Sequence, residues 1–197
     1  MRRKQAHTKR KPPGQIRIIA GQWRGQKLAV ADSEGLRPTS DSVRETVFNW
    51  LMPYIAGARC LDACAGTGAL GFESLSRGAV NVDFVEKNRN LCADIKANIE
   101  RFSTKANVYQ QSIDDFLATN SQQLNYDLVF IDPPFSAQMQ SSLCEQLDQG
   151  AWLADGALIY VEMPRSQTLE MPEHWELMRH KKTRQIQYAL LHRAGPR

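Results

Sequence analysis

The chain has 197 residues, of which 42% are hydrophobic and 23% charged, which is typical of a soluble globular protein with one domain and an extension. It has no run of 18 apolar residues and no apolar segment behind its basic N-terminus, so neither a membrane span nor a secretory signal is expected. Its four cysteines and four histidines lack zinc-ligand spacing, so we expect reduced thiols, a cytoplasmic protein and no metal site.

The net charge of +4 is unevenly distributed. Residues 1–31 contain nine Lys or Arg and no acid, whereas residues 32–197 contain 16 basic and 21 acidic residues. A basic segment on an acidic body is typical of nucleic-acid-binding proteins, although a solubilising tail has the same pattern. Residues 1–14 are polar and end in Pro-Pro-Gly, so we interpret them as a disordered basic arm.

Two β-prone runs, 15–20 and 26–30, flank a glycine-containing segment and predict a β-hairpin. We treat residues 15–35 as a nucleic-acid-binding extension and residues 36–197 as one larger domain. Trp23, near the tip, could stack on a base or fold back against the hairpin, and the sequence leaves both open. The candidate contacts on the hairpin are Arg17, Trp23, Arg24 and Lys27.

The segment from Ser42 to Glu45 fits a capping box with Ser42 as the helix N-cap. Apolar residues then recur at helical spacing as far as Tyr54, so a helix of about ten residues is predicted, with Pro53 limiting its end.

From Arg59 onward, strands alternate with helices. We predict strands at 59–63, 81–86, 106–110, 126–131 and 157–162, a terminal antiparallel pair at 175–180 and 187–192, and helices at 69–77, near 91–102, at 114–119 and at 139–147. This order predicts an α/β fold with a doubly wound, mostly parallel sheet. Ligands bind such sheets at the carboxyl ends of the strands.

A glycine-rich turn, Gly66–Gly71, follows the first of these strands and fits the pattern G-x-G-x-x-G. Its glycines would let a ligand approach the backbone at a helix N-terminus. Asp62 ends that strand, and Glu86, 20 residues after Gly66, ends the next one, where a carboxylate can accept hydrogen bonds from ribose hydroxyls. The turn alone fits a nicotinamide dinucleotide equally well, or no ligand at all. The loop at 111–114 is suited to holding an adenine.

The fourth strand ends in Asp132-Pro133-Pro134-Phe135. Two prolines have no N–H and hold the chain extended, which frees the Pro133 carbonyl to face a ligand. That carbonyl and the Asp132 carboxylate can each accept one N–H of an exocyclic amine while Phe135 stacks on its ring. Two acceptors favour a pyramidal nitrogen whose lone pair is aimed at an electrophile, and the carboxylate suits a cationic sulfonium donor.

These motifs resemble class I S-adenosylmethionine-dependent methyltransferases that act on exocyclic amines. More closely, the chain resembles the bacterial 16S ribosomal RNA guanine-N2 methyltransferases of the RsmD type, from Gln15 to about Tyr188. The glycine motif and Asp-Pro-Pro-Phe occur in many amine methyltransferases. The hairpin and the Leu36–Thr39 segment narrow the choice to this family.

The resemblance implies a Rossmann-like fold, a seven-stranded sheet with helices on both faces, and the N-terminal hairpin. It also implies a monomeric enzyme that methylates one guanosine N2 amine in 16S ribosomal RNA or the small ribosomal subunit. The expected cofactor-binding residues are Asp62, Ala63, Gly66, Thr67, Gly68, Glu86, Lys87, Ser112 and Ile113. The expected catalytic residues are Asp132, Pro133, Pro134 and Phe135, and those lining the RNA entrance are Arg37, Thr39 and Arg44. Many members have an acid where this chain has Ser112-Ile113.

Other functions remain open at this stage. A DNA amine methyltransferase could use the same Asp-Pro-Pro-Phe loop, but no segment is large enough for a separate target-recognition domain. A protein-glutamine methyltransferase usually has Asn at the first position of that loop. A dinucleotide oxidoreductase would need hydride-transfer residues, which we do not find, and a non-catalytic RNA-binding module would leave the loop unexplained.

Overall fold

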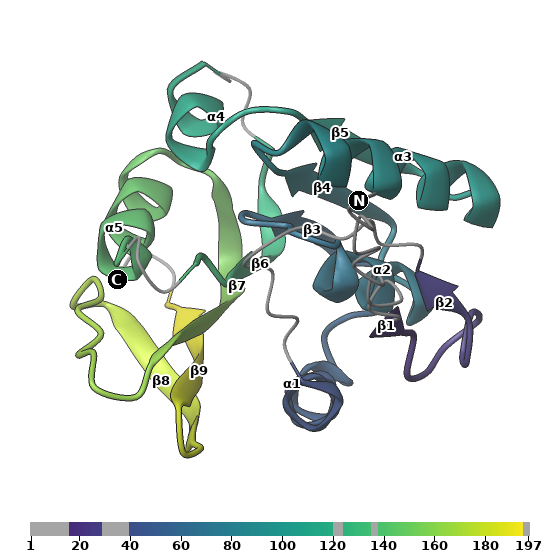
Figure 1. The fold of residues 1–197 in the computed structure, drawn as a ribbon. Coiled ribbons are helices and arrows are strands. Elements are labelled where there is room, and N and C mark those ends of the chain that lie inside the picture. Colours follow the sequence, from purple (N-terminus) through teal and green to yellow (C-terminus); the bar gives the residue numbers. More distant parts are fainter. Residues whose placement is uncertain (1–15, 29–39, 120–123, 135–137, 195–197) are drawn as a thin grey trace, which may run out of the picture.

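A computed structural model describes residues 16–28, 40–119, 124–134 and 138–194 (Figure 1). Its centre is a seven-stranded sheet in the order β5-β4-β3-β6-β7-β9-β8. The strands are β3 (Arg59–Asp62), β4 (Asn81–Val85), β5 (Ala106–Tyr109), β6 (Tyr126–Ile131), β7 (Leu153–Pro164), β8 (Trp175–Lys182) and β9 (Ile186–Arg193). A separate two-stranded sheet pairs β1 (Ile16–Arg17) with β2 (Lys27–Leu28).

Five helices in the described residues cover the two faces of the large sheet. They are α1 (Asp41–Leu51), α2 (Ala69–Ser76), α3 (Arg89–Phe102), α4 (Ile113–Thr119) and α5 (Gln140–Gln149). One buried cluster joins α1, α2 and the small hairpin to one face, with Val47, Leu70 and Leu28 among its members. The other cluster joins α4 and α5 to the opposite face through Phe116 and Leu143. The seven-stranded, mostly parallel sheet with helices on both faces confirms the predicted fold class.

The strand directions place the carboxyl ends of most strands on one edge of the sheet. Strands β3 to β7 pair in parallel, with Cys60 opposite Val82 of β4 and Leu128 of β6. Strand β9 is antiparallel to both β7 and β8, so β7 and β8 run in the same direction. The carboxyl ends of β3, β4, β6, β7 and β8 therefore lie on one edge, as the sequence pattern predicts for a ligand-binding sheet.

Two of the predicted boundaries were wrong. The N-cap of α1 is Ser40, whose hydroxyl accepts a hydrogen bond from the Val43 N–H at 3.4 Å, so the predicted capping box at Ser42 is displaced by two residues. Strand β7 begins at Leu153 instead of residue 157, because a register shift against β6 between Tyr126 and Leu128 accommodates the extra residues. A serine two positions earlier can cap as well, since both serines precede the same apolar pattern.

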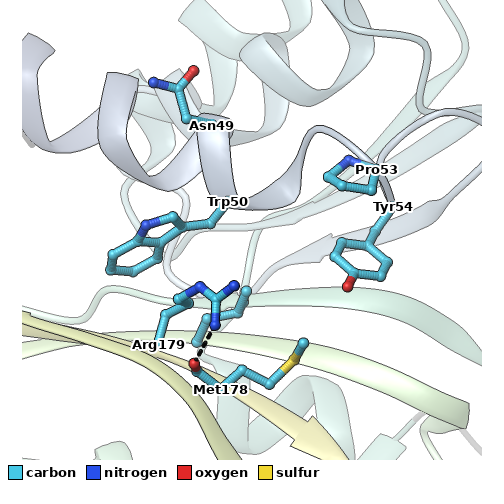
Figure 2. A pocket seen from close by; sticks show the side chains of 7 residues that line it. Asn49, Trp50, Pro53, Tyr54, Met178 and Arg179 are labelled. Carbon is cyan, nitrogen blue, oxygen red and sulfur yellow. Dashed lines mark hydrogen bonds between the residues drawn. The ribbon is translucent and has the colours of Figure 1, made fainter.

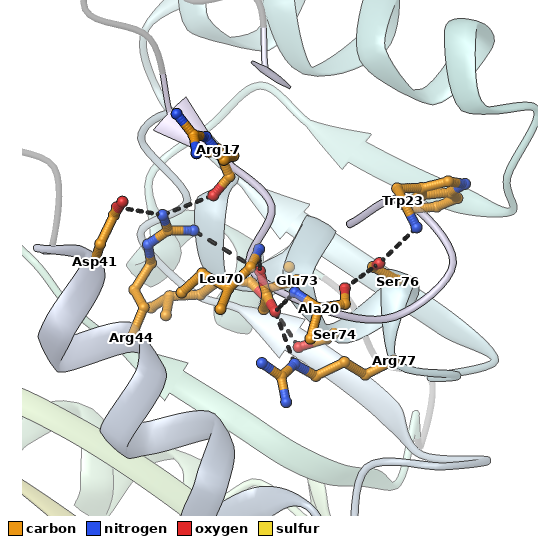
Figure 3. A network of polar contacts seen from close by, with 12 residues as sticks. Arg17, Ala20, Trp23, Asp41, Arg44, Leu70, Glu73, Ser74, Ser76 and Arg77 are labelled. Carbon is orange, nitrogen blue, oxygen red and sulfur yellow. Dashed lines mark hydrogen bonds and ion pairs between the residues drawn. The ribbon is translucent and has the colours of Figure 1, made fainter. Parts of the chain in front are cut away.

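The N-terminal hairpin is bound to α2 by a polar network that is centred on Glu73 (Figure 3). Glu73 is fully buried, and its carboxylate accepts the Ile19 N–H at 2.7 Å and the Ala20 N–H at 3.0 Å. Arg77 donates to the same carboxylate at 2.7 Å. A carboxylate that satisfies two backbone donors of another segment fixes that segment in place, because breaking the contact would leave a buried charge unpaired.

The hairpin loop also approaches α2 too closely for any side chain at Gly21. A Cβ there would lie 1.9 Å from the Ser76 carbonyl oxygen, and φ is +82°. Beyond it, Trp23 stacks on Phe102 of α3 with ring centroids 4.4 Å apart. The hairpin is therefore packed into the same body as the large sheet, and Trp23 packs against α3, whereas the prediction had its alternative position against the hairpin itself.

No helix among the described residues is both long enough and apolar enough to cross a lipid bilayer.

Candidate cofactor and amine-binding site at the carboxyl edge of the sheet

The glycine turn connects β3 to α2 in a conformation that only glycine adopts easily. Gly68 is the N-cap of α2 in the left-handed region, with φ +75°, and a Cβ there would lie 3.0 Å from Phe72. Asp62, at the end of β3, is buried and accepts a hydrogen bond from the Gly71 N–H at 3.0 Å. Ala63 and Thr67 are also buried. The turn therefore presents backbone at a helix N-terminus, with a carboxylate beneath it.

Glu86 directly follows β4, and its side chain contacts the glycine turn. Its carboxylate accepts the Gly66 N–H at 2.8 Å and the Asn88 N–H at 2.7 Å, and the side chain is half-buried. Lys87, the next residue, is exposed. The glycine turn and the acid 20 residues later are therefore in direct contact.

The Asp132 loop leaves β6 at the same edge. Ile131, the last residue of β6, pairs with Val161 of β7, and the chain continues through half-buried Asp132 to buried Pro133 and exposed Pro134. Phe135 lies outside the described residues.

The three strand ends are neighbours in the sheet, since Asp62 lies opposite Phe84 of β4 and Phe130 of β6, each two residues before Glu86 and Asp132. Burial, together with the negative charges of Asp132 and Glu86, raises the pKa of Asp62 to about 7, against the lowering effect of the Gly71 N–H. Burial likewise raises the pKa of the Cys64 thiol, and the carboxylates of Asp62, Asp132, Glu86 and Asp114 add to this effect. Charges influence one another in this way only over short distances. Asp62, Glu86 and Asp132 therefore lie at the ends of three neighbouring strands.

Asp114 belongs to the loop that we predicted to hold an adenine, but it was not among the predicted site residues. It directly follows Ser112-Ile113, the position where many family members have an acid. Its negative charge helps to raise the pKa of the Cys64 thiol. Ser112 itself uses its hydroxyl near the start of α4, where it bonds the Asp115 carboxylate at 2.7 Å, and Ile113 is buried in the core. The presence of an acid in the loop after the third strand was the signal that could have identified Asp114.

The charge of this edge discriminates between ligands. Clustered carboxylates favour a ligand that carries positive charge and oppose the pyrophosphate of a dinucleotide. S-adenosylmethionine carries a sulfonium and an ammonium group, and its ribose hydroxyls can donate to a carboxylate. The carboxylates of Asp62 and Glu86 and the backbone of the glycine turn therefore fit the chemistry of this cofactor.

The predicted RNA-contacting residues divide into three groups. Arg17, Arg24 and Lys27 are exposed on the hairpin, whereas Trp23 has one ring face covered by Phe102. Arg37 and Thr39 lie outside the described residues.

Arg44 is a correction to the predicted set. Its side chain has no exposed surface. It donates to the Arg17 carbonyl at 2.8 Å and to Asp41 at 2.7 Å, and lies 3.9 Å from Glu73. A buried guanidinium cannot reach a phosphate, so Arg44 positions the hairpin against α1 and α2 (Figure 3).

One further hollow lies apart from this edge. A hollow of about 200 Å³ between α1 and β8 is lined by Trp50, Tyr54 and Arg179, where Arg179 donates to the Met178 carbonyl (Figure 2). The described residues contain four free cysteines and no group of His, Cys, Asp or Glu arranged to hold a metal ion.

Comparison with known proteins places the chain among methyltransferases. The family described as conserved hypothetical protein 95 matches residues 16–192. Ribosomal RNA small subunit methyltransferase D of Haemophilus influenzae is 47% identical over 180 residues, which cover 90% of this chain and 93% of that protein. The protein of the same name from Escherichia coli strain K12 is 46% identical over 182 residues, which cover 91% of each chain.

Solved structures agree with this assignment. The putative methyltransferase yhhF from Escherichia coli has a TM-score of 0.85 at 42% identity and covers 92% of this chain and 99% of its own. An RNA methyltransferase from Salinibacter ruber in complex with S-adenosyl-L-homocysteine shares the fold at 12% identity, with a TM-score of 0.62 over 82% of this chain and 96% of that one. The chain belongs to the ribosomal RNA small subunit methyltransferase D family, an enzyme family with the Rossmann-like fold of S-adenosylmethionine-dependent methyltransferases.

Proposed function

We propose that this protein transfers a methyl group from S-adenosylmethionine to the exocyclic N2 amine of one guanosine in 16S ribosomal RNA. The observation that carries the proposal is the convergence of the Asp132 loop with Asp62 and Glu86 at one edge of the sheet. One side of this arrangement suits a cationic nucleoside and the other suits an amine. The protein would act as a monomer in the cytoplasm, on RNA or on the small ribosomal subunit.

The residues that hold the amine act by position and charge. The Asp132 carboxylate and the Pro133 carbonyl each accept one hydrogen of the amine, which directs its lone pair away from both acceptors. Phe135, two residues after Pro133 in the sequence, would stack on the guanine ring. No strong base is required, since the methylated ammonium loses its proton readily to water or to a nearby carboxylate. Positioning and electrostatic stabilisation therefore supply the catalysis.

The other half of the site would hold the methyl donor. Glu86 would accept from the ribose hydroxyls, and Asp62 would face the ammonium group, while Gly66, Thr67 and Gly68 allow close backbone approach. Ala63, Lys87, Ser112 and Ile113 complete the proposed set around the nucleoside. When bound, the cofactor supplies an electrophilic methyl group on a cationic sulfur.

The target base must leave its stack to enter this site, which costs a few kcal/mol and least for a nucleotide in a loop or bulge. Arg17, Arg24 and Lys27 on the hairpin, together with Arg37 and Thr39, would hold the RNA backbone around the entrance. Phosphate contacts of this kind fix orientation without reading sequence.

The direct test is methyl transfer from labelled S-adenosylmethionine to ribosomal RNA from cells that lack the protein. We expect label in one guanosine of 16S RNA, located by mass mapping, with naked RNA and small-subunit particles compared as substrates. Label in duplex DNA or in a glutamine-containing peptide instead would refute the RNA assignment. Thermal stabilisation by NAD but not by S-adenosylhomocysteine would refute the methyltransferase assignment.

A further inference from the structure

The C-terminal end of the chain carries a second segment without acids. Residues 177–197 contain six Lys or Arg and no Asp or Glu, whereas residues 32–176 contain ten basic and 21 acidic residues. The body between the two ends is therefore strongly acidic, and both ends are basic. Most of the C-terminal cations lie on β8 and in the turn that follows it.

The fold brings this segment to the edge that holds the candidate site. Strand β8 runs in the direction of β7, so its last residue, Lys182, lies at the carboxyl edge from which the Asp132 loop leaves β6. A tight turn, in which the Thr183 N–H donates to the Ile186 carbonyl at 2.8 Å, joins β8 to β9 there. The hairpin of β8 and β9, yellow in Figure 1, therefore extends the same edge.

One face of this hairpin is hollowed. A hollow of about 340 Å³ lies between the end of β7, the loop that follows it, and the hairpin. We call it the hairpin hollow. Most of its buried lining residues are apolar, its exposed lining residues include Arg165, His180 and Lys182, which we call its rim, and no acidic residue lines it.

The rim is built from fixed groups. Arg165 donates to the Thr183 carbonyl at 2.8 Å, which holds its guanidinium beside the turn. Gln187 bonds His180 at 3.0 Å and donates to the carbonyls of Pro164, Arg165 and Gln167, so it links the hairpin to the loop after β7. Among the described residues, neither Arg165 nor Lys182 has a carboxylate within 4.0 Å. Arg165 is therefore held in place by a hydrogen bond, and Lys182 is an exposed neighbour on the same rim.

We propose that the hairpin hollow binds the sugar–phosphate backbone of the ribosomal RNA substrate next to the target nucleotide, through Arg165 and Lys182. This inference rests on the proposed function for the identity of the RNA. Arg165 and Lys182 complement a polyanion, because they have no carboxylate within 4.0 Å and no acidic residue lines the hollow. The acidic body of the protein would repel RNA, except at such basic places. The basic N-terminal segment and this hollow would then hold the RNA on two sides of the Asp132 loop.

A simpler role for lysines on β8 is protection of an edge strand, since charged side chains prevent edge-to-edge pairing. That role would apply equally to both faces of the strand. Successive residues of a strand point to opposite faces, so Lys182 lines the hollow while Lys181, opposite Tyr188, belongs to the other face. The two lysines therefore form a matched pair for a test.

The experiment compares Lys182→Gln with Lys181→Gln in the full chain. Binding of a 16S RNA transcript is measured over a range of salt concentrations, with Lys105→Gln as a control for charge far from this edge. We expect Lys182→Gln to weaken binding about fourfold at physiological salt and to lower the salt slope by about 0.7, because one phosphate contact to a single strand is lost. Lys181→Gln and Lys105→Gln should leave both quantities unchanged.

Equal effects of Lys181→Gln and Lys182→Gln, or no effect of either, would overturn the proposal, and aggregation of both variants would point to edge protection. Thermal stabilisation by S-adenosylhomocysteine should be unchanged in all three variants, which shows that they are folded. Methyl transfer is measured separately from binding. Failure of the wild-type protein to methylate RNA would refute the proposed function, and the binding comparison would still decide the role of the hollow.

Discussion

Asp132 is the residue on which the proposed chemistry depends most. It directly follows β6, is half-buried and precedes a proline that has no N–H. Its negative charge helps to raise the pKa of buried Asp62. We expect Asp132→Ala to lower the rate constant kcat for methyl transfer at least 10²- to 10³-fold, since it removes one acceptor from the amine. Single-turnover transfer from labelled S-adenosylmethionine measures this.

The control for Asp132→Ala is cofactor binding, which should remain because the Asp62 and Glu86 contacts are untouched. Asp132→Asn retains the shape and one acceptor oxygen but loses the charge, so its rate should lie between those of the wild type and Asp132→Ala. Normal turnover by the alanine variant would contradict amine activation by this residue.

Asp62 predicts a dependence of cofactor binding on pH. Burial and the charges of Asp132 and Glu86 raise its pKa to about 7, so the carboxyl group is protonated below that pH. Binding of an ammonium group requires the carboxylate, and the α-amino group of the ligand stays charged throughout the range below pH 7. The affinity for S-adenosylhomocysteine should therefore fall about tenfold per pH unit below pH 7, as measured by calorimetry.

The ligand-free protein offers a second measurement of the same group. Because the folded pKa of Asp62 lies above the ordinary value of 3.8, the free energy of unfolding should fall as pH rises from about 4 to 7. Asp62→Asn should flatten both profiles. If the affinity of that variant still fell below pH 7, a group other than Asp62 would be responsible for the pH dependence.

At the scale of elements, the N-terminal hairpin depends on contacts with α2 and α3. Gly21 and Gly25 both have positive φ, +82° and +81°, but only Gly21 faces a close neighbour, the Ser76 carbonyl. We expect Gly21→Ala to lower the free energy of unfolding by about 3 kcal/mol and Gly25→Ala by about 1 kcal/mol. Urea denaturation measures both, and equal losses would show that backbone conformation alone matters.

Burial also decides the roles of Arg44 and Trp23. Sequence pattern cannot distinguish an exposed arginine on a helix from a buried one, because both follow the same spacing. Arg44 is buried because Asp41, the Arg17 carbonyl and Glu73 surround it, and these come from three separate segments. The same holds for Trp23, whose stacking partner Phe102 is 79 positions away.

At the scale of the whole molecule, the charge distribution suggests which part of the N-terminus can be removed. The hairpin strands are packed into the body, so deletion of residues 1–31 would remove core residues such as Ile18 and Leu28. Deletion of residues 1–14 removes six Lys or Arg and leaves those contacts intact. We expect it to weaken RNA binding and to lower the salt slope by up to about 4. An unchanged slope would show that this segment makes no phosphate contact.

The sequence by itself determined the fold class, the family and the motifs that follow β3, β4 and β6. Alternating strand and helix patterns are local, and the glycine turn, Glu86 and the Asp132 loop are short motifs whose chemistry can be read from adjacent residues. Their convergence followed from a general property of parallel sheets. The boundaries of α1 and β7 did not follow, since capping and register depend on competing positions.

Only the tertiary structure decided which charged and aromatic side chains are free to meet a ligand. It buried Arg44 and covered one face of Trp23. It added Asp114 to the acidic edge and placed Lys182 beside Arg165 on an acid-free rim. Each of these results depends on contacts between segments that are distant in sequence. The physical reason is that burial and electrostatic coupling depend on distances in space, which local sequence patterns do not encode.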